Sequence, residues 1–275
     1  MILLLPTRIQ FSMNLSRHQY PLEITAAIEN EQVKALFDKV NSGTPIIFSA
    51  TNDGGWESSS SGGQIIIGTS ATKYPVEAFA HELLHAELKQ NGYRQYLNMV
   101  ALTSPSISSF YLGVLSMLDN ELQHHKIFSR YLELGLVSKR FYRDSDKNTY
   151  AAVRRSVQKM KRSDHPALFL LQFASVIAPG GAGEEKQRIQ LRNFIQQACQ
   201  TSTWQVLVRV ESLIHTYRDS QLLDARDTIK AILQLLVGED KVWFGETGCM
   251  DLSKGTFVGP AFTDDEVKAY FQGPT

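Results

Sequence analysis

Residues 81–85 read His-Glu-Leu-Leu-His, which combines two metal-binding side chains with an acid. Residues four apart lie on one face of an α-helix, so the imidazoles of His81 and His85 can bind one metal ion. Glu82 lies beside that face, where its carboxylate can take a proton from a water on the metal without being a ligand. The spacing therefore predicts two ligands of a zinc ion, Zn2+, and one general base.

The flanking residues predict that this motif lies on a buried helix over residues 75–91. Pro75 suits the first turn of a helix, and Asn91 with Gly92 suits its end. Apolar side chains also give the helix a broad apolar surface: Val76, Phe79, Ala80, Leu83, Leu84 and Leu88. We expect burial to hold the imidazoles rigidly. The alternative is an ordinary amphipathic helix that carries polar residues by chance.

A catalytic zinc usually has a third protein ligand. The extended motif H-E-x-x-H-x-x-G-x-x-H is excluded, because Leu88 and Asn91 stand where it needs glycine and histidine. A later helix, predicted over residues 117–134, carries Asp-Asn-Glu-Leu-Gln-His-His at 119–125. Glu121 falls on the rim of its apolar face, where a carboxylate is costly to bury unless it is paired or bound to metal. We therefore expect Glu121 to be the third ligand.

Two adjacent histidines follow on the same helix. His125 lies one turn beyond Glu121 and is expected to be catalytic as a proton donor, to replace a ligand, or to orient one. A purely structural hydrogen-bonding role is the alternative. His124 points about 100° away from His125 and is predicted to be a surface residue. A donor to the developing oxyanion is also needed. The candidates are His125, Tyr93, Tyr111, Tyr150, His165 and His215.

The pair of motifs, His81-Glu82-x-x-His85 followed by Asn120-Glu121, resembles the gluzincin metallopeptidases of the thermolysin-like clan. The resemblance covers residues 45–135, about a third of the chain, and its second motif is short. It implies that His81, His85 and Glu121 hold zinc and that Glu82 is the general base. Where the family has an acidic residue four positions after the ligand glutamate, this chain has His125. The resemblance also implies that the strand at 64–69 lies at a sheet edge, where it would bind an extended peptide backbone.

These residues predict a zinc metallopeptidase that hydrolyses peptide bonds of a protein or peptide substrate. Glu82 would activate a zinc-bound water, accept its proton, and deliver that proton to the departing amine. The alternative is a non-catalytic zinc-binding module, with regulatory or protein-interaction functions, built on a peptidase-like core.

Composition narrows the class of protein. The chain has 275 residues, with 28 basic and 28 acidic side chains, and this balance argues against a dedicated nucleic-acid binder. Two cysteines exclude a disulfide-rich scaffold and favour a reducing, cytoplasmic location. The first six residues lack the basic region of an export signal, so we expect a strand or arm there. No apolar run is long enough to predict a membrane span.

The hydrophobic pattern predicts an α+β fold that is mostly α. Strands are expected at residues 8–13, 45–48 and 64–67, with a mobile connection at 52–63 and an irregular segment over the last 37 residues. The expected helices span residues 21–40, 75–91, 106–134, 147–162, 166–178, 184–200, 203–218 and 222–237. We expect a zincin-like domain at 1–135, with a small sheet and a metal-binding helix pair, and a helical domain at 136–275.

Overall fold

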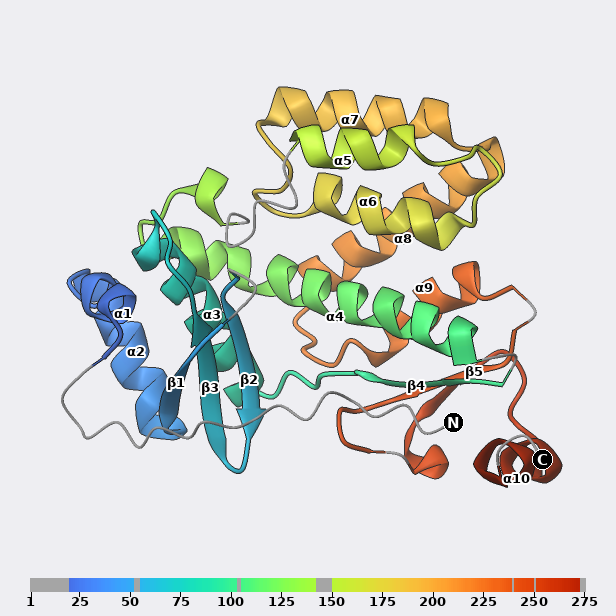
Figure 1. The fold of residues 1–275 in the computed structure, drawn as a ribbon, viewed down its shortest axis with the longest axis horizontal. Coiled ribbons are helices and arrows are strands. Elements are labelled where there is room, and N and C mark those ends of the chain that lie inside the picture. Colours follow the sequence, from blue (N-terminus) through green and yellow to red (C-terminus); the bar gives the residue numbers. More distant parts are fainter. Residues whose placement is uncertain are drawn as a thin grey trace.

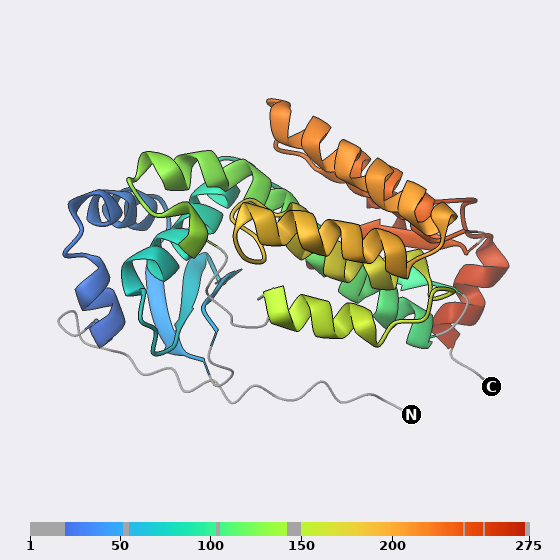
Figure 2. The ribbon, with the colours of Figure 1, turned by 90° about the horizontal axis from the view of Figure 1, so that it is seen from above.

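The computed structural model describes residues 20–51, 55–102, 105–141, 150–238, 240–249 and 251–272. The predicted N-terminal arm and the strand at 8–13 lie outside these residues. Helices dominate the described residues, and two small three-stranded sheets accompany them, so the predicted mostly α, α+β class is confirmed. The first sheet and its helices lie at one end of the molecule, and the later helices lie at the other (Figure 2).

Two helices form where one was predicted over residues 21–40. Helix α1 spans Leu22–Ala27 and α2 spans Glu31–Gly43. Asn30 separates them because its backbone is extended and its side chain accepts hydrogen bonds from two amides of α2. An asparagine in this position is a strong helix start, so the chain ends one helix and begins another there.

The first sheet has the strand order β1-β3-β2. Strand β1 spans Ile46–Ala50 and runs parallel to β3, Gln64–Thr69, and β2, Glu57–Ser61, is antiparallel to β3. The prediction of a mobile connection at 52–63 is wrong for the part that forms β2. Its serines have no apolar side chains to bury, but the backbone of a strand pairs without them, and Gly62 and Gly63, both with positive φ, provide the turn. The predicted edge position of β3 is also wrong, because β3 is central.

Helix α3, Pro75–Gln90, carries the His-Glu-x-x-His motif. Pro75 stands in the first turn, Asn91 ends the helix, and Gly92 follows with φ of 104°, as the sequence predicts. The helix packs against α1, α2, β2 and α4. All twelve of its residues from Glu77 to Leu88 are buried, so its polar side chains lie in the interior of the molecule.

Helix α4, Pro105–Glu133, runs through the middle of the molecule (Figure 1). It packs against α3 on the side of the first sheet, and against α6, α8 and α9 from the later part of the chain. Because α4 has neighbours on several sides, more than one of its faces is buried. This position determines which of its polar residues meet α3.

The later helices agree with the predicted ones. They are α5 (Tyr150–Gln158), α6 (Pro166–Ile177), α7 (Glu185–Ala198), α8 (Thr201–Asp219) and α9 (Arg226–Leu236). None of the helices in the described ranges has both the length and the apolar character that crossing a bilayer requires.

The C-terminal segment is more regular than predicted. It contains β5 (Val242–Gly245), the short helix η3 (Leu252–Lys254), β6 (Thr256–Val258) and α10 (Asp264–Gln272). Strand β5 pairs with β6 and with β4, Asn98–Ala101, to form the second sheet. The buried side chains of β5 explain the order, because Val242 and Phe244 join the hydrophobic core that the helices share. The domain division near residue 136 stays a prediction, although strands from both sides of it share this sheet.

Candidate metal centre

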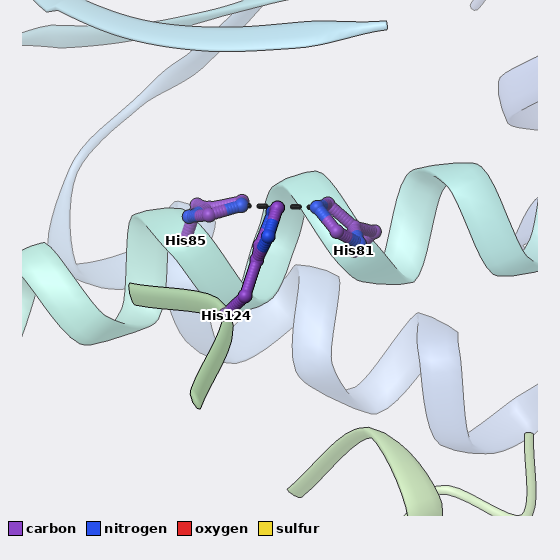
Figure 3. A group of neighbouring side chains, drawn as sticks. All are labelled: His81, His85 and His124. Carbon is purple, nitrogen blue, oxygen red and sulfur yellow. Dashed lines mark hydrogen bonds between the residues drawn. The ribbon is translucent and has the colours of Figure 1, made fainter. Parts of the chain in front are cut away.

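Three histidines from two helices meet in the interior. His81 and His85 project from α3, and the ring of His124 comes from α4 to lie beside them (Figure 3). One ring nitrogen of each histidine lies within 4.8 Å of the other two. The Nε2 atoms of His81 and His85 are 3.0 Å apart. Within the described ranges, this is the group of histidines, cysteines and acids with the spacing to hold a metal ion.

The geometry of the pair fits a bound transition metal. Two imidazole nitrogens that each lie about 2.0–2.1 Å from a tetrahedral zinc ion are about 3.3 Å apart. The observed separation of 3.0 Å between the Nε2 atoms is close to that value. Imidazole donors suit zinc, copper, iron and nickel, whereas magnesium and calcium prefer oxygen. The pair therefore fits a metal of the zinc type, and His124, whose ring nitrogen lies within 4.8 Å of both, is the candidate for a third ligand.

Burial keeps His81 and His85 in the state that binds metal. All three histidines of the cluster are buried. Burial lowers the pKa of His81 well below its ordinary value, and the neighbouring His85 and His124 lower it further, while the backbone of Phe141 acts in the opposite direction. Burial likewise lowers the pKa of His85, and His124 adds to the effect. The two imidazoles are therefore neutral near pH 7, with lone pairs available for a metal.

A chain of buried hydrogen bonds fixes the orientation of His85. The side chain of Gln123 donates from Nε2 to Oδ2 of Asp119 at 2.8 Å, so its carbonyl oxygen faces His85. His85 must then donate from Nδ1 to that oxygen, at 2.9 Å, and its Nε2 carries the lone pair. Oδ1 of Asp119 accepts from the hydroxyl of Tyr93 and the amide of Tyr96. Such partners commonly orient metal-binding histidines.

Asp119 is the buried acid at the end of this chain. Burial raises its pKa to about 6, while hydrogen bonds from Tyr96, Tyr93 and Gln123 oppose the rise. Near pH 7 the group is therefore mainly a carboxylate, which accepts hydrogen bonds and does not donate them. Because Asp119 is a carboxylate, it accepts a hydrogen bond from the amide nitrogen of Gln123. The carbonyl oxygen of Gln123 therefore stays turned toward His85.

Phe141 closes one side of the histidine cluster. Its ring centroid lies 4.7 Å from that of His81 and 5.4 Å from that of His124. Phe141 directly follows the short helix η1, Ser138–Arg140, and Arg140 donates a hydrogen bond to Glu77 of α3. This ion pair connects the segment that carries Phe141 to α3.

A cavity of about 570 Å³ opens on the other side of the cluster. It lies between β2, α3, α4, α6 and the segment before β4, and its lining is mostly polar. Helix α4 contributes a continuous stripe to the lining: Gly113, Ser116, Met117, Asn120, Glu121 and His124. Glu82 is buried, lines the same cavity and stands outside the histidine cluster. A carboxylate and a potential metal site therefore share one substrate-sized space.

The structure places two residues of α4, His124 and Glu121, near the histidine pair of α3. The prediction that His124 is a surface residue is wrong, because α4 is buried on the face that meets α3 as well as on its apolar face. Glu121 is also buried and lines the cavity, with Oε1 3.6 Å from Nδ1 of His124. His124 joins the ring nitrogens of the α3 pair, whereas Glu121 contacts His124 from its own helix.

His125 lies away from the cluster. Its ring packs against that of His215 of α8, with centroids 5.9 Å apart, and it is not among the residues that line the cavity. Burial, followed by His215 and His124, lowers the pKa of His125 to about 3. In the structure, this residue belongs to the contact between α4 and α8 and does not line the cavity that Glu82 lines.

The other expected oxyanion donors have different roles in the structure. None of Tyr93, Tyr111, Tyr150, His165 or His215 lines the cavity. The hydroxyl of Tyr93 donates to Asp119, that of Tyr111 donates to Asp240, and His165 accepts from the amide of Ala167 at the start of α6. These bonds explain why the groups do not point into the site.

Three positions in the site were missed by the sequence reasoning: His124, Gln123 and Asp119. One available signal was the spacing of Asp119 and Gln123, which lie one helical turn apart and so share a face. Because a carboxylate accepts from a glutamine amide at that spacing, the pair could have been read as a support for a ligand on α3. The choice between His124 and His125 needed the packing of α4.

Comparison with known proteins gave no match: no family model, curated protein or solved structure resembles this chain. The resemblance to gluzincins therefore rests on the motifs alone. What the structure adds is a buried cluster, His81, His85 and His124, close enough to hold a metal ion.

Proposed function

We propose that the protein is a zinc-dependent metallopeptidase in which His81, His85 and His124 hold the metal and Glu82 is the general base. The observation that carries the proposal is the arrangement of three buried imidazoles beside a buried carboxylate at the wall of one cavity. Three protein ligands with space for a fourth partner are typical of a catalytic zinc site, whereas structural sites are closed by four.

Zinc, when bound, supplies a Lewis acid that polarises a carbonyl and makes water acidic near pH 7. Glu82 accepts the proton as the water oxygen adds to the carbonyl carbon of the substrate. When the C–N bond breaks, Glu82 passes this proton to the amine nitrogen, and the other product is a carboxylic acid. The burial of Glu82 strengthens its interaction with the charges that develop in the site.

The shape of the site supports a peptide substrate. Strand β2 pairs on one side only within the described residues, and its Glu57 and Ser58 line the cavity. The edge strand of a sheet offers alternating amides and carbonyls that an extended peptide can match. In this proposal β2 has the role that the sequence reasoning assigned to residues 64–69.

The test is a Glu82→Gln variant, with Glu87→Gln as the matched control. Both acids are buried on α3, but Glu87 pairs with Lys39 and does not line the cavity. We expect Glu82→Gln to keep one metal ion per chain and to lose roughly 10²–10⁴-fold in peptide hydrolysis, because only the general base is removed. Glu87→Gln should keep both properties. Metal analysis and a proteome-wide search for new peptide termini provide the measurements.

Two results would reject this function. If the freshly purified protein holds no transition metal, the proposed centre is absent. If the protein holds metal but the wild type produces no new peptide termini, a non-catalytic metal-binding module explains the site better than a peptidase does.

A further inference from the structure

Lys89 is a cationic side chain in the cavity wall. It lies on α3 four residues after His85, is partly buried, and lines the same space as Glu82 and the histidine cluster. Within the described ranges its ammonium group forms no hydrogen bond or ion pair. Lys34, Lys39, Lys126 and Lys241, by contrast, each have a hydrogen-bond partner.

The surroundings of Lys89 offset only part of the cost of placing it there. Burial lowers the pKa of Lys89, and the more distant charges of Asp119 and Glu82 partly oppose this. The carboxylate of Asp119 already accepts from Tyr93, Tyr96 and Gln123. An ammonium without a direct acceptor is unfavourable in a partly buried position. A ligand that brings an anionic oxygen would remove this cost.

The position of Lys89 on α3 determines how far a bound anionic group would lie from the metal site. Four residues of α-helix advance about 6 Å along the axis, so Lys89 follows His85 by little more than one turn. An extended peptide advances about 3.3 Å per residue. A negative group held by Lys89 would therefore lie about one or two residues from a carbonyl placed at the histidine cluster.

The charge of the cavity favours a singly charged group. The lining carries more acidic than basic side chains, because Lys89 lies there together with four acids: Glu57, Glu82, Asp119 and Glu121. A phosphate near pH 7 carries up to two negative charges and would be repelled more strongly than a carboxylate with one. Peptides carry a single carboxylate at the C-terminus of every chain.

We propose that Lys89 binds the free C-terminal carboxylate of a peptide substrate and thereby directs cleavage to the last one or two residues. This inference rests on the proposed peptidase function and specifies its substrate class as peptides with a free C-terminus. Lys89 is a specificity residue in this scheme, whereas Glu82 and the histidines perform the reaction.

Binding can be measured without turnover. Zinc-loaded Glu82→Gln protein is titrated by calorimetry with N-acetyl-trialanine and with the same peptide carrying a C-terminal amide. We expect the free acid to bind at least about tenfold more tightly, since a hydrogen bond between two charged groups is about twice as strong as one between neutral groups. Adding Lys89→Met should make the two peptides equal, and Lys89→Arg should restore part of the preference.

The control variant is Lys39→Met in the same background. Lys39 contacts Glu87 on the opposite side of α3 and does not line the cavity, so the preference for the acid should persist. Metal content of each variant shows whether the centre is intact. A third titration, with inorganic phosphate, tests whether Lys89 binds a phosphate more tightly than a peptide carboxylate.

The proposal is overturned if acid and amide bind equally, if neither binds, or if Lys89→Met retains the preference. Lys89-dependent binding of phosphate that is tighter than that of the acid overturns it as well. The two functions can fail separately. Cleavage of acid and amide peptides at equal rates leaves a peptidase without a carboxylate site, whereas Lys89-dependent binding of the acid without any hydrolysis leaves the site and rejects the peptidase.

Discussion

The two sides of α4 place adjacent histidines in different surroundings. His124 and His125 are equally buried, with 4% and 5% of their surface exposed. His124 meets two further imidazoles at the wall of a cavity, whereas His125 meets His215 in the contact with α8. Neither ring nitrogen of His125 has a hydrogen-bond partner among the described residues. Residue type and burial therefore do not distinguish a metal ligand from a packed side chain.

What distinguishes them is the helix that each face contacts. Helix α3 brings two imidazoles whose Nε2 atoms lie 3.0 Å apart, and an imidazole added to them completes a set of three potential metal ligands. Helix α8 brings a single histidine, and burial keeps His125 neutral in that contact. Convergence of donors, and not the burial of one donor, is the feature that indicates metal binding.

The sharpest way to test this comparison is to remove each histidine in turn. We expect His124→Ala to weaken zinc binding by more than about 100-fold, because loss of a residue that merely orients a ligand already costs 10–100-fold. His125→Ala should leave zinc affinity within about threefold, since its ring lies outside the cluster. Competition with a fluorescent chelator measures both affinities.

Thermal unfolding provides an independent readout of the same pair. A ligand that binds only the folded protein raises the free energy of unfolding, by about 4 kcal/mol at 1,000 times its dissociation constant. Removal of zinc with a chelator should therefore lower the Tm of wild-type and His125→Ala protein, and change that of His124→Ala much less. Equal chelator effects in the two variants would remove the distinction between the two faces.

The sequence was sufficient to predict where α3 begins and ends and that His81 and His85 share one of its faces. Pro75 and Gly92 mark the ends of α3, and the spacing of His81 and His85 places both rings on one face. These features depend on residues within a turn or two of each other, and local sequence decides them. The helices of the later half were predictable for the same reason.

The rest depended on contacts between distant segments. Glu121 was favoured as a ligand because it lies at the rim of one apolar face, but α4 is covered on several sides, so that face does not identify the one that meets α3. Strand β2 was missed because its serines carry no apolar pattern, and its pairing with β3 is made by the backbone. Neither the burial of several faces of α4 nor the pairing of β2 with β3 can be predicted from the spacing of side chains along one element.

A smaller effect is expected from the residue that orients His85. In Gln123→Leu, the Nδ1 hydrogen of His85 loses its acceptor, and Asp119 loses a donor. We expect zinc affinity to fall by about 10–100-fold, as is typical for partners of metal-binding histidines. Asp119→Asn should cost less than Gln123→Leu, because Gln123 remains to accept from His85. The chelator competition assay ranks the two, and the reverse order would place the main support of His85 elsewhere.

The smallest effect should follow the substitution of Glu121, and it decides between two ligand sets. If His124 is the third ligand, Glu121→Gln removes only the charge 3.6 Å from Nδ1 of His124, and zinc affinity should fall by less than about tenfold. If Glu121 is itself the ligand, this variant should lose more than about 100-fold, while His124→Ala loses little. The absorption spectrum of the cobalt-substituted protein, which reports the donor set, should change in His124→Ala and persist in Glu121→Gln. The opposite pattern would restore the arrangement of two histidines and a glutamate that the sequence motif favours.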